Sequence, residues 1–153
     1  MLDRIFPKQA DNTYRGHRLA LWLLVLIVLL KLAMSYGILF DTRHVIQTAD
    51  SIALDSFDAP AQDTVVLIFR LLGVSHLLLA LLGVVVLLRY RALIPFFYVV
   101  LLIEQIARKA IVLAFPIART GVEYLPVDPN LVFAAALAIG LVLSLQGKRY
   151  ATA

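Results

Sequence analysis

The sequence predicts an all-α integral membrane protein, a four-helix bundle with both termini on the cytoplasmic side. Two observations lead to this prediction. Hydrophobic residues make up 62% of the chain and charged residues 16%, against roughly 45–50% and about 25% in an average soluble domain. The apolar residues are also gathered in four stretches, and crossing a bilayer as a helix takes roughly 20 such residues.

The four stretches predict that the whole chain is a single membrane domain. The spans are expected over 19–40, 64–88, 92–117 and 130–146. Only residues 89–91 separate the second span from the third, so these two are expected to form an antiparallel hairpin. Pro129 precedes the fourth span, where proline suits a helix start. Lys31 interrupts the first stretch and apolar residues follow it, which favours a membrane span over a cleaved signal peptide.

The distribution of charge predicts the orientation, because lysine and arginine are enriched in cytoplasmic segments. With both ends inside, the cytoplasmic segments carry Arg4, Lys8, Arg15, Arg18, Arg89, Arg91, Lys148 and Arg149, and the external loops carry Arg43 and Arg119. The acids of the external loops are Asp41, Asp50, Asp55, Asp58, Asp63, Glu123 and Asp128. Eight basic residues against two is a strong bias toward this orientation.

The first external loop has a pattern of its own. Apolar residues from Val45 to Phe57 recur at helical spacing, opposite Asp50, Asp55 and Asp58. This pattern predicts a short amphipathic helix over about 43–58 that lies on the outer surface or caps the bundle. A connector packed on the bundle and a lid over a cavity both fit it.

Ionisable residues interrupt three of the spans, and each of them needs a partner or water inside a membrane. They are Lys31, Arg70, His76, Glu104, Arg108 and Lys109. The helical rise per residue places all of them in the middle and outer half of the membrane, whereas the inner half is almost wholly apolar. Glu104 and Arg108 stand four residues apart, so an ion pair is expected between them.

These residues predict a ligand site. Four cations face one carboxylate in this layer, which favours an anionic ligand or a water-filled opening. The candidate ligand-binding residues are Lys31, Arg70, His76, Glu104, Gln105 and Arg108. A lipid-like, quinone-like or other anionic ligand is the first hypothesis, because an apolar cavity with a few convergent polar groups is the usual form of such sites.

Three other interpretations remain open. A small proton-coupled transporter would use His76 and Glu104 as a relay, and a lipid-modifying enzyme would use the same two residues as acid and base. The cluster is also compatible with a purely structural role that fixes how the helices pack.

Small residues on two spans predict close helix packing. Gly73 and Gly83 lie on the second span and Ala136, Gly140 and Ser144 on the fourth. The seam on the fourth span fits packing within the bundle and equally fits a homodimer.

Composition excludes several classes of site. The chain has no cysteine, so thiolate metal sites and iron–sulfur clusters are excluded. His76 is the lone histidine inside the spans, so a haem held by two histidines is not expected, and no metal site is predicted. The basic residues flank the spans and form no patch, so the expected partners are membrane lipids and not nucleic acid.

The second and third spans carry a family resemblance. The run Phe69 to Arg91, with its Arg70-x-x-Gly73 pattern, resembles the second helix of the small four-helix bacterial membrane proteins of the DoxX-like kind. Ala92 to Ile117 resembles the next helix of their relatives. The resemblance implies a bacterial inner-membrane location, and it singles out Arg70 and Gly73. The family is named after members associated with quinone-linked sulfur oxidation.

Overall fold

A computed structural model of the chain describes residues 5–116 and 128–146. All regular structure in these two ranges is helical, which confirms the all-α part of the prediction. The helices are α2 (Arg18–Phe40), α3 (Thr42–Thr48), α4 (Ala59–Arg89), α5 (Ile94–Ala114) and α6 (Pro129–Leu145), with 3-10 turns η1 (Leu54–Ser56) and η2 (Arg91–Leu93). Some residues that entered the predictions lie outside the described ranges, namely Arg4, Ile117, Arg119, Glu123, Lys148 and Arg149.

Two of the helices are long and apolar enough to cross a membrane, namely α2 with 23 residues and α4 with 31. Helix α5 has 21 residues, but Glu104, Arg108 and Lys109 reduce its apolar character. Helix α6 is strongly apolar but has only 17 residues. Length and composition therefore support two of the four predicted spans directly.

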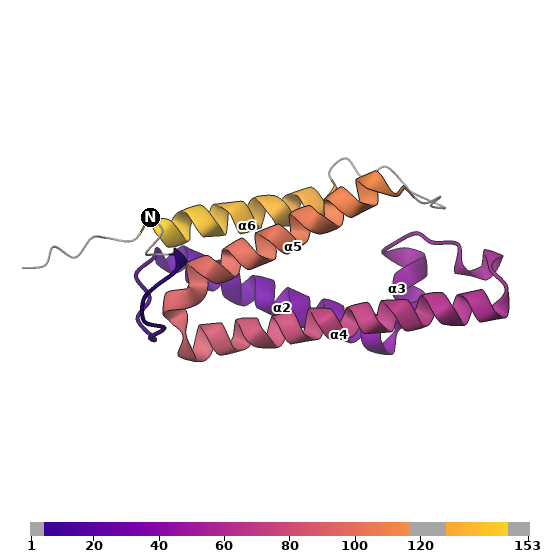
Figure 1. Ribbon diagram of the computed structural model, residues 1–153, viewed down its shortest axis with the longest axis horizontal. Coiled ribbons are helices and arrows are strands. Elements are labelled where there is room, and N and C mark those ends of the chain that lie inside the picture. Colours follow the sequence, from indigo (N-terminus) through magenta and orange to yellow (C-terminus); the bar gives the residue numbers. More distant parts are fainter. Residues whose placement is uncertain (1–4, 117–127, 147–153) are drawn as a thin grey trace, which may run out of the picture.

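The four long helices form two antiparallel pairs (Figure 1). Helix α2 packs mainly on α4, helix α5 packs on α6, and α2 against α6 is the main contact between the pairs. The pairs meet where α2 begins and η2 joins α4 to α5, which we call the closed end. They diverge toward α3, which we call the open end (Figure 1).

The closed end holds the larger hydrophobic core. Its fully buried members include Leu24 of α2, Phe97 and Tyr98 of α5 and Leu137 of α6. The Tyr98 hydroxyl donates a 2.7 Å hydrogen bond to the Ala20 carbonyl, and so ties α5 to α2.

Four of the predicted packing residues are buried, namely Gly73, Gly83, Gly140 and Ser144, and Ala136 is half-buried. Gly140 lies against the Tyr98 ring and Gly83 against Val28 and Phe97, so closely that a Cβ atom at either glycine would overlap them. The small-residue seam of α6 therefore faces α5 of the same chain at Gly140.

The helix at the open end is shorter than predicted. Helix α3 ends at Thr48 instead of continuing to about 58, because Ser51 adopts a left-handed backbone with φ of 55° and turns the chain. The turn allows Ile46 of α3 and Leu54 of η1 to pack together with Val66 of α4. The apolar residues of this loop thus pack on α4.

Candidate functional site

Four polar side chains from three helices meet between the two helix pairs. They are Lys31 of α2, His76 of α4, and Glu104 and Arg108 of α5, and we call them the central cluster. Lys31 lies among the buried residues of α2. His76 lies among the buried small residues of α4. The same faces that build the helix contacts therefore bring these polar groups together.

The Glu104 carboxylate is the centre of the cluster. The Lys31 ammonium donates a 2.6 Å hydrogen bond to Oε2 of Glu104, and Nε of Arg108 donates a 3.2 Å bond to Oε1. Nε2 of His76 lies 3.7 Å from the same Oε1. One carboxylate thus joins α5 to α2 and faces α4.

The contacts of His76 bear on its tautomer. Its Nδ1 atom lies 3.2 Å from Nη2 of Arg108 and 3.1 Å from the Leu72 carbonyl oxygen. A guanidinium only donates hydrogen bonds and a carbonyl oxygen only accepts them, so the Arg108 contact is a hydrogen bond when Nδ1 is unprotonated and the Leu72 contact is one when Nδ1 carries the proton. In the first tautomer the ring proton sits on Nε2 and faces Glu104.

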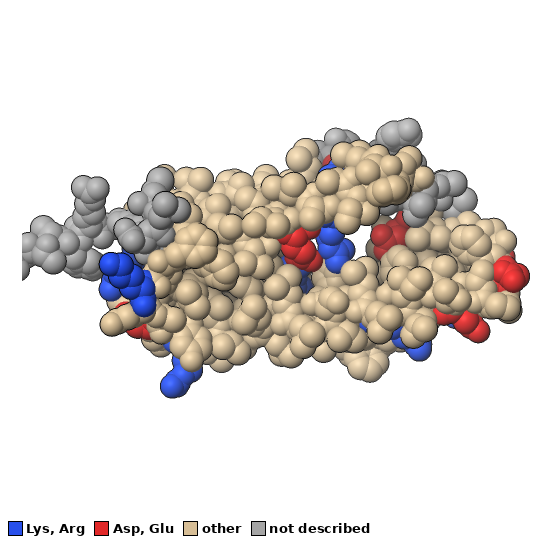
Figure 2. All heavy atoms as spheres, viewed as in Figure 1, with Lys and Arg blue, Asp and Glu red and all other residues tan. Residues whose placement is uncertain are grey.

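The cluster carries more positive than negative charge. Lys31 and Arg108 face one carboxylate and an imidazole that is neutral in either tautomer, which leaves one excess positive charge. The Lys31 side chain is only 4% exposed, whereas that of Arg108 is 39% exposed. Figure 2 shows acidic and basic atoms side by side in a hollow between α4 and α5. Arg108 is therefore the cation that a ligand in the hollow would meet.

Apolar side chains continue from the cluster toward the open end. Ile111, Val112 and Phe115 follow Arg108 by one to two turns on the same face of α5, and all three are exposed. On α4, Leu72 stands one turn before His76 and is also exposed. The face of α5 that carries Arg108 is therefore apolar from the cluster toward the open end, and Leu72 adds an exposed apolar side chain on α4.

The other predicted site residues do not join the central cluster. Arg70 is exposed, and its Nε donates a 3.3 Å hydrogen bond to the hydroxyl of Thr42. The Gln105 amide lies 3.3 Å from both the backbone oxygen and the side-chain oxygen of Asn130 in α6. Thr42 was not predictable as a partner, because it lies just beyond the first apolar stretch.

Lys109 also has a partner away from the cluster. Its ammonium donates a 2.7 Å hydrogen bond to Asp128, the residue that caps α6. That bond, with the backbone N–H of Asn130, holds the pKa of Asp128 below its usual value. Arg70 and Lys109 therefore lie outside the central cluster and add no charge to it.

No grouping of histidine, aspartate and glutamate suited to a metal ion occurs within residues 5–116 and 128–146. Comparison with protein-family models, with curated proteins and with solved structures finds no match for this chain. The DoxX-like resemblance thus remains a prediction, and the site is interpreted from its geometry.

Proposed function

We propose that the chain is an integral membrane protein with four spanning helices that binds the anionic head of an amphiphilic ligand at the central cluster. The observation that carries the proposal is the excess positive charge of the cluster, with Arg108 accessible at the base of an apolar hollow. Such a hollow with a few convergent polar groups is the usual form of a ligand site.

The exterior of the helices supports the membrane part of the proposal. Large hydrophobic side chains are exposed on all four long helices, among them Trp22, Leu78, Ile106 and Val142. Soluble proteins rarely expose apolar surface on this scale. The charges of α5 also have partners, because Glu104 and Arg108 face the cluster and Lys109 reaches Asp128. Ionisable residues in spanning helices are typically paired in this way.

The lengths of the helices fit the same arrangement. The 17 residues of α6 make a helix of about 26 Å, close to the thickness of about 30 Å of a hydrocarbon core. With the basic residues at the closed end, this end lies in the cytoplasm and α3 lies outside.

Single cysteines test this topology, because the natural chain has none. We expect Ser51→Cys, at the open end, to react with a membrane-impermeant maleimide in intact cells. Gln9→Cys and Tyr90→Cys, at the closed end, are expected to react only after permeabilisation. Labelling of Ser51→Cys and Gln9→Cys from the same side would contradict the orientation.

The chemistry of the cluster indicates the class of ligand. A carboxylate or phosphate accepts charge-assisted hydrogen bonds from a guanidinium, and a quinone oxygen is a weaker acceptor for the same donor. A lipid-like tail fits the exposed Ile111 and Phe115 above Arg108. An anionic amphiphile therefore matches both parts of the hollow.

Transport receives less support from the structure. A proton-coupled carrier needs polar groups on both sides of the relay formed by His76 and Glu104. Toward the closed end, the described interior is instead the apolar core around Leu24, Phe97 and Leu137. The enzymatic alternative rests on the same two residues and gains no further group from the structure.

Binding of chain-matched amphiphiles tests the proposal. We expect native mass spectrometry of the purified protein to show bound dodecanoate or dodecyl phosphate and no dodecyltrimethylammonium. Arg108→Gln removes the accessible cation and is expected to weaken anion binding by at least about tenfold, the range for a hydrogen bond to a charged group.

The control is Arg43→Gln, which removes a half-exposed cation at the open end that pairs with Asp63. It is expected to leave anion binding unchanged. Equal binding of the cationic and anionic amphiphiles, or an unchanged affinity in Arg108→Gln, would overturn the proposal.

A further inference from the structure

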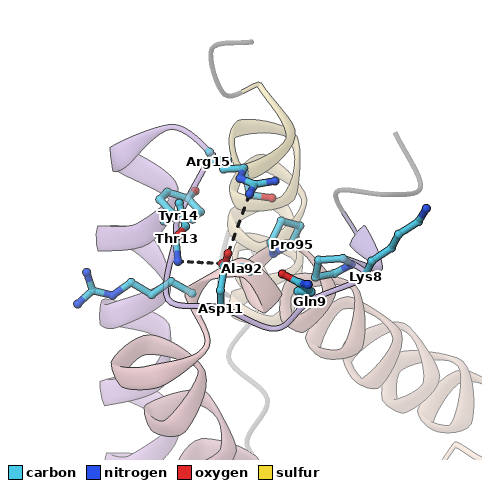
Figure 3. A pocket seen from close by; sticks show the side chains of 12 residues that line it. Lys8, Gln9, Asp11, Thr13, Tyr14, Arg15, Ala92 and Pro95 are labelled. Carbon is cyan, nitrogen blue, oxygen red and sulfur yellow. Dashed lines mark hydrogen bonds and ion pairs between the residues drawn. The ribbon is translucent and has the colours of Figure 1, made fainter. Parts of the chain in front are cut away.

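A second pocket lies at the closed end, away from the central cluster. Its volume is about 480 Å³, and it lies between the N-terminal loop, the start of α5 and the end of α6. The polar residues around it include Lys8, Gln9, Asp11, Tyr14, Arg15 and Arg91. Figure 3 shows Asp11 facing Arg15 in this pocket, with Lys8 extending outward from the rim.

Backbone hydrogen bonds fix the walls of the pocket. The N–H of His17 donates to the Leu143 carbonyl at 3.2 Å, and the N–H of Ala92 donates to the Asp11 carbonyl at 3.2 Å. The Asp11 side chain also accepts from the N–H of Thr13 at 3.0 Å. The N-terminal loop is therefore held across the ends of α4, α5 and α6.

Aromatic residues pack the loop in place. The rings of Phe6 and Phe96 lie 5.5 Å apart, and the Tyr14 hydroxyl donates to the His17 carbonyl at 3.0 Å. Burial raises the pKa of Tyr14 to about 12, so this hydroxyl keeps its proton at neutral pH. These contacts hold the N-terminal loop beside α5 and the start of α2.

The pocket has an excess of positive charge. Lys8, Arg15 and Arg91 line it together with one acid, Asp11. Arg91 donates through Nε to the Leu87 carbonyl at 2.9 Å, which leaves its terminal nitrogens available. Arg15 lies 4.0 Å from Asp11, too far for a hydrogen bond. Within the described part of the chain, Lys8 has no hydrogen-bond partner.

Arginine and lysine donors of this kind match the oxygens of a phosphate. The Gln9 amide and the Thr13 hydroxyl beside them suit the hydroxyl groups of a polyol. The pocket also borders the ends of the long helices, which is the depth of lipid headgroups if these helices span a membrane.

We propose that this pocket binds the phosphodiester headgroup of an anionic phospholipid through Lys8, Arg15 and Arg91. The inference rests on the proposed membrane placement, but it is independent of the ligand of the central cluster. A soluble phosphate ester shares the same chemistry, so the test separates the two sources.

The test titrates the full-length protein in detergent with phosphatidylglycerol, phosphatidylcholine and glycerol phosphate, and follows binding by native mass spectrometry. We expect phosphatidylglycerol to bind more tightly than phosphatidylcholine. The double variant Lys8→Gln with Arg15→Gln is expected to weaken phosphatidylglycerol binding on the order of tenfold. Neither side chain makes a hydrogen bond within residues 5–116 and 128–146, so the fold is expected to persist.

The matched control is Arg18→Gln with Arg89→Gln, which removes two cations at the same end that do not line this pocket. It is expected to bind phosphatidylglycerol as the wild type does. An equal loss of phosphatidylglycerol binding in the test and control variants would show only a general attraction to basic residues, and would overturn the assignment of the lipid to this pocket. Glycerol phosphate binding as tightly as the lipid would overturn the lipid assignment.

The same experiment tests the two proposed sites independently. If Arg108→Gln loses phosphatidylglycerol binding and Lys8→Gln/Arg15→Gln keeps it, the lipid binds at the central cluster and the closed-end site is overturned. Failure of dodecanoate to bind at Arg108 would overturn the proposed function and leave the closed-end site standing.

Discussion

Replacing Glu104 by glutamine is expected to lower the free energy of unfolding by about 3–5 kcal/mol, the range for removing one partner of a buried ion pair. The Lys31 ammonium is almost fully buried and lies 2.6 Å from the Glu104 carboxylate. Without that carboxylate, Lys31 and Arg108 are two cations with no counter-charge between the helix pairs. The measurement is a titration with SDS in mixed micelles, followed by circular dichroism.

Two further variants make this result interpretable. Asp63→Asn breaks the exposed pair with Arg43 and is expected to cost at most about 1 kcal/mol. Lys31→Met in the Glu104→Gln background removes the stranded cation and is expected to recover most of the loss, because an apolar replacement of a buried pair is often neutral. A Glu104→Gln loss no larger than that of Asp63→Asn would show that water already solvates the cluster.

Gly140→Ala is expected to destabilise the contact between α5 and α6 by about 2–4 kcal/mol. A Cβ atom at position 140 would overlap the fully buried Tyr98 ring, and overpacking of this kind costs about 1–3 kcal/mol. Movement of the ring would also break the hydrogen bond to the Ala20 carbonyl, which is worth about 1 kcal/mol. The same titration measures the loss.

Gly37→Ala is the matched control for this substitution. A Cβ atom there would lie 3.5 Å from Val45, which is an ordinary contact, and alanine is the better helix former by up to about 1 kcal/mol. Gly37→Ala is therefore expected to be neutral or slightly stabilising. Similar behaviour of the two variants would contradict the close packing of α6 on Tyr98.

The helices were predictable because long apolar stretches leave few alternatives to a helix. The start of α2 at Arg18 and the ends of α4 and α6 lie within a residue of the predicted bounds. The start of α4 lies five residues earlier than predicted, at Ala59 instead of 64, because polar residues such as Gln62 and Asp63 continue the helix beyond the apolar stretch. Hydropathy does not report such an extension.

The central cluster was only partly predictable. The spacing of Glu104 and Arg108 predicts their contact, and the estimated depths of Lys31 and His76 bring them to the same level. Depth does not reveal which way a side chain faces, however. Gln105 follows Glu104 by about 100° around α5, and so it faces α6 instead of the cluster.

At the ends of the helices, contacts with α3 and α4 explain two further differences between the prediction and the structure. Arg70 bonds to Thr42, a contact between residues 28 positions apart in the chain. The left-handed turn at Ser51 shortens the predicted amphipathic helix, because the segment must return Leu54 to the surface of α4. Both features depend on how α3 packs on α4, which periodicity alone does not reveal.

The single excess charge of the central cluster also sets the valence of the ligand that it prefers. A singly charged carboxylate makes Lys31, Glu104, Arg108 and the ligand electrically neutral as a group. A doubly charged phosphate monoester would leave one uncompensated negative charge in a medium of low dielectric constant, where such a charge is costly. Electroneutrality therefore ranks dodecanoate ahead of fully ionised dodecyl phosphate.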